Sequence, residues 1–99
     1  MLSGKDFENQ IFKKAAFVDK DLKHKVFSHC VFEGCDLTRS NLTGAKFLEC
    51  AMHHCNLSLV KLDGCRLQGL EFQNCKLVGV NFGKCDSMFL SVKFINCLI

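Results

Sequence analysis

Residues 35–64 read CDLTRSNLTGAKFLECAMHHCNLSLVKLDG, and every fifth residue of this stretch is large and apolar: Leu37, Leu42, Phe47, Met52, Leu57 and Leu62. A period of five fits neither the 3.6-residue repeat of an α-helix nor the two-residue repeat of a strand. Outside the stretch the same register runs from Leu2 to Phe82, which is seventeen positions without a miss. The chain is therefore built from five-residue units, each with an apolar centre.

The positions around each centre also have a fixed character. All eight cysteines lie two residues before a centre position, and six of the seven glycines lie two residues after one. Cysteine is a small and slightly apolar side chain that suits a tight inward position. Glycine suits a corner where the backbone needs a positive φ. We therefore expect two inward positions per unit, namely the centre and the residue two before it.

Read as units, the segments CDLTR, SNLTG, AKFLE, CNLSL, CRLQG, CKLVG and VNFGK resemble the A(D/N)Lxx pattern of the pentapeptide-repeat family. The resemblance covers the chain from about Leu2 to Ile99. It implies an all-β fold, a right-handed quadrilateral parallel β-helix with four five-residue faces per coil. With ~4.8 Å between stacked backbones, about five coils would make a rod of roughly 24 Å. We expect residues 1–99 to form this single domain.

The register predicts which side chains form the core. Stacked centres carry most of the stability, because burying one such side chain contributes about 1.5 to 3 kcal/mol. The predicted core comprises Phe7, Phe12, Phe27, Phe32, Phe47, Leu57, Leu67, Phe72, Leu77, Phe82, Cys35, Cys55 and Cys75.

The segment CAMHHC, residues 50–55, has the composition of a metal site but not the expected geometry. Cys50 and Cys55 occupy inward positions, whereas His53 and His54 follow a centre and are expected to point outward. Zinc needs convergent ligands at ~2.0 to 2.3 Å. We expect no metal, no cofactor and no catalytic residue, and we predict that the protein is not an enzyme.

The two ends of the repeat differ. In residues 1–25 the inward small position holds Lys5, Lys20 and Lys25, and a lysine cannot lie unpaired inside a packed coil. We therefore interpret residues 1–25 as an N-terminal capping coil. The C-terminal end, INCLI, carries no cap. We expect a fragment of a longer repeat protein, with end-to-end homodimerisation through the C-terminal coil as the second interpretation.

The register slips by two residues in CDSMFLSVKF. Ser87 lies where a centre is due, and Phe89 is expected to take that role. A bulge or small corner loop is predicted at residues 86–89.

Composition excludes several functional classes. The net charge is +3, and basic and acidic residues are scattered along the chain. This distribution does not favour nucleic acid as a partner. The N-terminal MLSGKDFENQ lacks the apolar segment of a signal peptide, and no apolar run approaches the ~20 residues of a membrane span. We expect a cytoplasmic protein with reduced thiols and no membrane association.

We therefore predict a non-enzymatic scaffold that binds a protein partner. The candidate contact residues are apolar side chains expected to point outward: Ile11, Val31, Ala51, Leu48, Leu59 and Val78. The resemblance supplies an alternative, because some bacterial pentapeptide-repeat proteins protect DNA gyrase and topoisomerase IV from quinolones or peptide toxins by mimicking duplex DNA. Direct nucleic-acid binding is a third reading, with Lys46 and Arg66 as its basic column.

Overall fold

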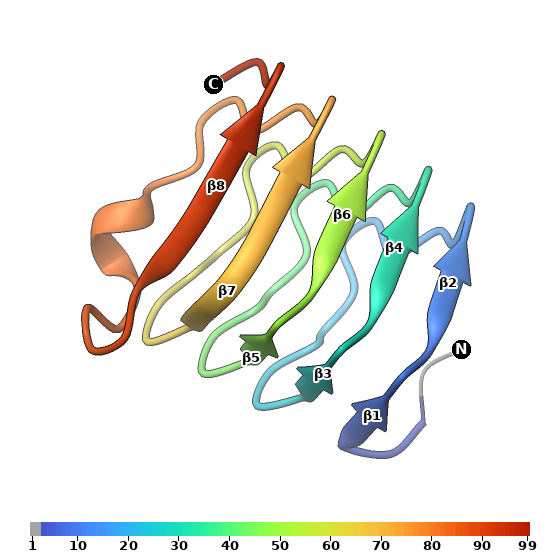
Figure 1. Cartoon of the computed structure of the whole chain (residues 1–99), viewed down its shortest axis with the longest axis vertical. Coiled ribbons are helices and arrows are strands. Elements are labelled where there is room, and N and C mark those ends of the chain that lie inside the picture. The colour runs from blue at the N-terminus through green and yellow to red at the C-terminus, as the bar shows by residue number, and fades with distance from the viewer. Residues whose placement is uncertain (1–2) are drawn as a thin grey trace.

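The computed structural model describes residues 3–99 and is a four-sided β-helix made of parallel strands. Figure 1 shows the coils stacked side by side from the N-terminus to the C-terminus. Residues 6–85 make four coils, and residues 86–99 make part of a fifth. The all-β parallel β-helix expected from the sequence is confirmed.

Two faces of the helix carry regular strands, whose bounds are β1 (Asp6–Glu8), β2 (Ile11–Lys13), β3 (Val26–Ser28), β4 (Val31–Glu33), β5 (Lys46–Leu48), β6 (Ala51–His53), β7 (Arg66–Gln73) and β8 (Ser91–Ile95). One face has the strand order β1-β3-β5-β7 and the next has β2-β4-β6-β7. The long strand β7 runs across the corner between them and pairs with β8. The other two faces are held by isolated parallel bridges, such as Asp36 with Asn56.

The four faces use two kinds of corner. After the centres of the bridged faces, the N–H of the third residue donates to the centre carbonyl, as from Ser40 to Leu37 at 2.9 Å. At the corners that follow β1, β2, β3, β4, β6 and β7, the thiol of a cysteine in the next coil supplies a donor instead. The Cys50 thiol, for example, donates to the Phe27 carbonyl at 3.2 Å.

Six of the eight cysteines make such a bond from one coil to the next: Cys30, Cys35, Cys50, Cys55, Cys75 and Cys97. The inward cysteine therefore fills space and also satisfies a carbonyl that the corner leaves without its local donor.

The centres stack at a spacing of twenty residues. Phe7 pairs with Phe27, and Phe27 pairs with Phe47. The ring centroids of these pairs lie 5.2 Å and 5.0 Å apart, with the rings nearly parallel. Each ring therefore packs against the ring of the next coil rather than crossing the helix. Aromatic contacts of this kind add about 0.5 to 1.5 kcal/mol beyond simple burial.

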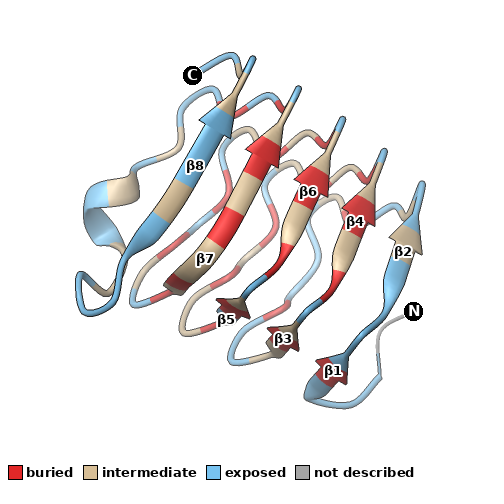
Figure 2. Ribbon diagram, in the orientation of Figure 1, coloured by how far each residue is buried: buried red, intermediate tan, exposed pale blue. Residues whose placement is uncertain are grey.

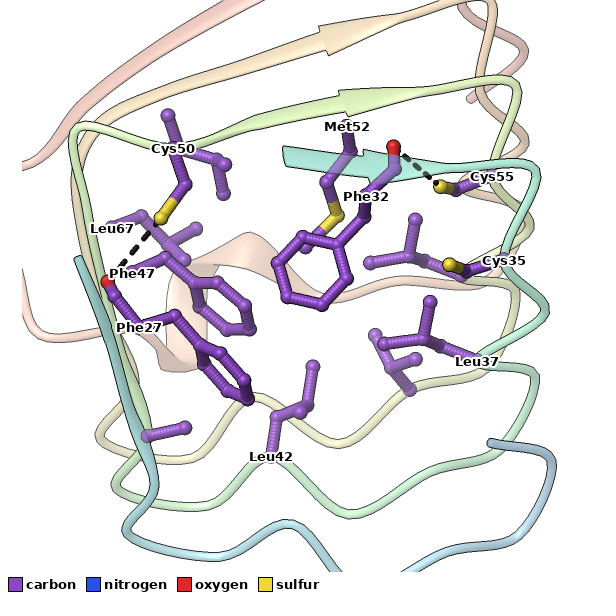
Figure 3. Packing of buried hydrophobic residues seen from close by; sticks show 14 of the residues in the cluster. Phe27, Phe32, Cys35, Leu37, Leu42, Phe47, Cys50, Met52, Cys55 and Leu67 are labelled. Carbon is purple, nitrogen blue, oxygen red and sulfur yellow. Dashed lines mark hydrogen bonds between the residues drawn. The ribbon is translucent and has the colours of Figure 1, made fainter. Parts of the chain in front are cut away.

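The predicted core residues lie inside, as the red bands along the strands in Figure 2 show for coils one to four. Phe27, Phe32 and Phe47 are each 1% exposed, and only Phe12 and Phe82 of the predicted set are half-buried. Figure 3 shows the rings and leucines filling the interior. The space enclosed among these side chains is about 10 Å³, which is no more than one water molecule needs.

The first coil is closed by a lysine. The Lys25 ammonium donates to the Gly4 carbonyl and lies 5.7 Å from the centroid of the Phe7 ring. Its charge thus reaches solvent at the end of the helix while its stem covers the ring. This contact supports the interpretation of residues 1–25 as a capping coil, which stays a proposal; Met1 and Leu2 lie outside the described residues.

The prediction that Phe89 is a centre is wrong, because Phe89 is 63% exposed and lies in a turn with φ 61°. The register of the fourth coil is last seen where the Asp86 N–H donates to the Cys65 carbonyl. At the start of β8 the pairing has already shifted, since Ser91 pairs with Gln68 and Val92 pairs with Leu70. Phe94 then stacks on Phe72, so the two additional residues lie between Asp86 and Val92. This interval overlaps the predicted segment 86–89, whose bounds stay a prediction.

Within residues 3–99, no helix is long and apolar enough to cross a membrane.

Candidate functional site

The exposed apolar side chains gather in the last, incomplete coil. Nine large apolar residues are exposed in the described chain, and six of them belong to this coil. We call these six the terminal apolar surface: Met88, Phe89, Leu90, Phe94, Leu98 and Ile99. In Figure 2 the strand β8 is mostly pale blue, whereas the neighbouring β7 is banded with red.

Exposure at this end follows from the direction in which side chains lean. At four corners a long side chain lies against the glycine one coil later: Lys14 at Gly34, His24 at Gly44, Glu49 at Gly69 and Leu59 at Gly79. Side chains that lean towards the C-terminal end find a coil to pack on everywhere except in the last coil. Phe7 in the first coil is accordingly 8% exposed, whereas Phe94 in the last is 41% exposed although it stacks on Phe72.

The turn before β8 presents two of these residues at its tip. The N–H of Leu90 donates to the Ser87 carbonyl at 3.4 Å, so Met88 and Phe89 are the central residues of the turn. The Asp86 carboxylate accepts the Met88 N–H at 2.9 Å and fixes the first half of the turn. Phe89 has a positive φ, which a bulky side chain rarely adopts. Glycine or asparagine would suit this position better for folding alone.

Arg66 borders the terminal apolar surface on the same face. Its guanidinium lies 5.9 Å from the Phe89 ring centroid and 3.4 Å from the Asp86 carboxylate. The Met88 N–H, and after it Arg66, lower the pKa of Asp86 below its usual value, so this carboxylate stays charged at neutral pH. Arg66 Nε is buried without a hydrogen-bond partner, so Asp86 satisfies only part of the guanidinium. The site thus combines an exposed aromatic ring with a cation and a carboxylate.

Comparison with known proteins places this fold in a family. The family model described as "Pentapeptide repeat region" matches residues 25–99. The chain belongs to the pentapeptide-repeat family. No curated protein matches the sequence significantly. The family explains the five-residue register, and it carries no information about a particular partner.

Solved structures of the same fold include QnrB1, a plasmid-mediated fluoroquinolone resistance protein. The M102R trypsin-treated form superimposes with a TM-score of 0.71 at 21% identity, over 94% of this chain and 45% of that one. The R167E trypsin-treated form gives a TM-score of 0.45 at 17% identity, over 94% of this chain and 52% of that one. The pentapeptide-repeat chain described here thus spans about half the length of these structures, and the likeness is one of fold.

The predicted contact residues are only partly exposed. Ile11, Val31 and Ala51 form one column along β2, β4 and β6, but Val31 and Ala51 are half-buried and only Ile11 is open. Leu48 lies half-buried on the neighbouring face. Leu59 is 57% exposed and Val78 is 46% exposed. Backbone bonding joins these last two residues, since the Leu59 N–H donates to the Val78 carbonyl.

Sequence reasoning missed the terminal apolar surface for one reason. It assigned Phe89 the role of a centre and placed Met88 in the predicted bulge at residues 86–89. A signal was available, because MFL is the only run of three consecutive large apolar residues in the sequence. Two residues that are adjacent in the chain cannot both point into the interior of this fold.

The CAMHHC segment has the arrangement predicted for it. The thiols of Cys50 and Cys55 donate to carbonyls inside the helix, and His54 lies at an exposed corner with φ 55°. His53 pairs along the sheet with Glu33 and with Gln73. Within residues 3–99, no group of three or more histidine, cysteine or acidic residues is placed to hold a metal ion.

The cysteine column behind this segment consists of Cys35, Cys55 and Cys75. The two outer thiols hold the pKa of Cys55 well above the usual cysteine value, and burial acts in the same direction. Each outer thiolate would accept a hydrogen bond from Cys55, which lowers the pKa of Cys35 and of Cys75. All three are buried and free, so this column is part of the core rather than a reactive site.

Proposed function

We propose that this pentapeptide-repeat protein is a non-enzymatic binding protein whose contact region is the terminal apolar surface. The observation that carries the proposal is the concentration of six of the nine exposed large apolar residues in the last coil. Contiguous exposed apolar surface is uncommon on a protein that stays alone, and it is typical of association sites.

The backbone of the last coil supports the same proposal. The second, third and fourth coils are each paired on both sides, whereas β8 pairs with β7 and with no other described strand. Its outer edge therefore carries N–H and C=O groups that a strand from a partner can pair with. A second copy of the chain could supply such an edge, so we propose an end-to-end homodimer through the C-terminal coil as one form of this association.

A second candidate function is protection of DNA gyrase or topoisomerase IV from fluoroquinolones. Its support is the fold that the chain shares with QnrB1, a fluoroquinolone resistance protein. The net charge of +3 distinguishes the present chain from a strongly acidic mimic of DNA. We rank this function second and regard a cytoplasmic location as the setting that both candidates require.

The first experiment compares two matched surface variants. Phe89 and Ile11 are each 63% exposed, but only Phe89 belongs to the terminal apolar surface. Light scattering coupled to size-exclusion chromatography is expected to show a dimer for the wild type and for Ile11→Ser. The Phe89→Ser and Leu98→Asp variants are expected to be monomeric with unchanged circular dichroism. A monomeric wild type at all accessible concentrations would remove the homodimer and leave a heterologous partner.

The second experiment measures gyrase supercoiling in the presence of ciprofloxacin. Restoration of supercoiling at a stoichiometric amount of the wild-type protein, and its loss in Phe89→Ser but not in Ile11→Ser, would favour topoisomerase protection through the terminal apolar surface. Unrestored supercoiling with a folded sample would exclude that candidate for this chain. The general binding proposal would then be tested by cross-linking and affinity capture with the same two variants.

A further inference from the structure

Two of the eight cysteines differ from the rest in their hydrogen bonding. The other six thiols each donate to a carbonyl of the preceding coil, which fixes the direction of the side chain. Within the described residues, the thiols of Cys65 and Cys85 donate to no carbonyl. The reason is the kind of corner, because the backbone N–H of Cys65 and of Cys85 already closes the turn onto the centre carbonyl.

These two cysteines are neighbours in successive coils. They follow Ala45 in the same inward column, and the N–H of Asp86 donates to the Cys65 carbonyl at 2.9 Å. Strands stacked in this way hold their α-carbons ~4.8 Å apart, which lies inside the range that a disulfide spans. Cys65 is fully buried, whereas Cys85 is half-buried and is reachable from the surface.

The backbone around Cys85 departs from the regular coil. A short 3-10 helix, η1 (Phe82–Lys84), precedes it, and Cys85 is the residue that ends this helix. In the regular coils a corner residue donates to the carbonyl nineteen residues later, as Gly44 does to Asp63 and Leu59 does to Val78. Gly64 instead donates to Lys84, twenty residues later. The register at Cys85 itself is regular, since the Asp86 N–H donates to the Cys65 carbonyl twenty-one residues earlier, as the Arg66 N–H does to Ala45. The two side chains can turn toward each other because, among the described residues, neither thiol is held by a carbonyl acceptor.

We propose that Cys65 and Cys85 form an oxidisable thiol pair, a modification site that closes as a disulfide between the third coil and the fourth. In the reaction each thiol loses a proton and the pair loses two electrons as the S–S bond forms. Hydrogen peroxide would take up these electrons and protons as its O–O bond breaks, to give two molecules of water. A diazenedicarboxamide oxidant would take them up to give the corresponding hydrazine.

Closing this pair would tether the end of the fourth coil, directly before the turn that presents Met88 and Phe89. The disulfide would enclose the segment from Cys65 to Cys85, which includes β7 and η1. A cross-link of this length restricts the unfolded chain strongly. Oxidation is therefore expected to raise the melting temperature by roughly 5 °C or more in a domain of this size.

The reaction is expected to be slow at neutral pH. Burial raises the pKa of Cys85 to about 11 and that of Cys65 to about 12, so the attacking thiolate is a minor species. The pair is expected to react in preference to the other thiols because Cys85 is accessible and because the Cys65 and Cys85 side chains are free to rotate. The cysteines of the column through Cys35, Cys55 and Cys75 are buried and are held by their carbonyl acceptors.

Tryptic digestion identifies the product without ambiguity. Cleavage after lysine and arginine places Cys65 in the peptide 62–66 and Cys85 in the peptide 85–93, and no other cysteine lies in either. After treatment of the folded protein with diamide, the expected result is a mass loss of two hydrogens, six remaining thiols in the unfolded protein and a cross-link between these two peptides. Reduction with dithiothreitol should restore eight thiols and the original melting temperature.

Two variants serve as controls. Cys85→Ser removes the accessible partner and should keep all seven of its thiols under the same treatment. Cys65→Ala is expected to fold, because Ala45 occupies the same column one coil earlier, and it should likewise keep its thiols. The proposal is overturned if the wild type retains eight thiols. It is also overturned if the cross-link joins other peptides or different molecules.

Discussion

Removing the Ser40 hydroxyl should make the protein more stable, which is an unusual expectation for a core substitution. Ser40 is 1% exposed, and its Oγ has no hydrogen-bond partner among the described residues. It occupies the inward column of a bridged face, and its own N–H already closes the turn onto the Leu37 carbonyl. The hydroxyl has therefore been taken out of water without a replacement for its lost hydrogen bonds.

The magnitude follows from two opposing contributions. A buried hydroxyl without a partner costs about 1 to 3 kcal/mol of desolvation, which Ser40→Ala removes. The lost oxygen leaves a small void, and a void of that size costs about 0.5 kcal/mol. The net effect is a gain of about 0.5 to 2.5 kcal/mol, or an increase in melting temperature of roughly 2 to 12 °C for a domain of this length.

The assay is reversible urea denaturation of Ser40→Ala, with Ser28→Ala on the half-buried strand β3 as the matched surface control. The control is expected to change the free energy of unfolding by less than about 0.5 kcal/mol. A loss of stability in Ser40→Ala of more than about 1 kcal/mol would refute the reasoning, because it would mean that the hydroxyl makes a favourable bond in solution.

Three other predictions test the core, a corner and the response to acid. Phe32→Ala and Phe47→Ala should each cost about 3 to 5 kcal/mol, since both rings are 1% exposed; an unchanged melting temperature for either would contradict the register of centres. Gly69→Ala should cost about 1 to 2 kcal/mol from its φ of +70°, and adding Glu49→Ala should recover at most ~0.5 kcal/mol because the carboxylate that meets the new β-carbon can swing aside; full recovery would show that the clash dominates. Hydrogen bonds from the hydroxyl and the N–H of Thr38 lower the pKa of Asp36. The charged Asp36 carboxylate therefore stabilises the fold above pH ~4, and this stabilisation is lost as the pH falls through the lowered folded-state pKa. Asp36→Asn should reduce this acid sensitivity in thermal melts at pH 3 and pH 7, since asparagines accept the same N–H in the other coils; an undiminished loss at pH 3 would point to other carboxylates.

The repeat register predicts the fold because its two inward positions leave the chain few ways to bury them. The seventeen centres from Leu2 to Phe82 and the cysteines two before them predict the packed interior residue by residue. The two kinds of corner are not visible at this level, since CRLQG and CKLVG read alike although only the second is followed by a backbone closure, from the Val80 N–H to the Leu77 carbonyl. That difference decides which thiols hydrogen bond, so the distinct state of Cys65 and Cys85 appears only in the structure.

The choice of the inward residue near the slip needed information that the pattern does not contain. Hydrophobicity favours Phe89 over Ser87 as the inward residue. In the structure the Leu90 N–H donates to the Ser87 carbonyl, and this turn leaves Phe89 exposed at its tip. The Phe89 ring then lies beside the Arg66 guanidinium rather than in the core.

The unequal ends of the rod also limit how copies can associate. Stacking the last coil of one copy on the first coil of another would place Phe94 and Leu98 against an end that presents the Lys25 ammonium, and it would remove that charge from water. Pairing two last coils buries apolar surface against apolar surface and leaves both lysine-covered ends in solvent. A head-to-tail contact could repeat into a filament, whereas the second arrangement closes at two copies. The direction in which the side chains lean therefore favours a closed dimer over an open polymer.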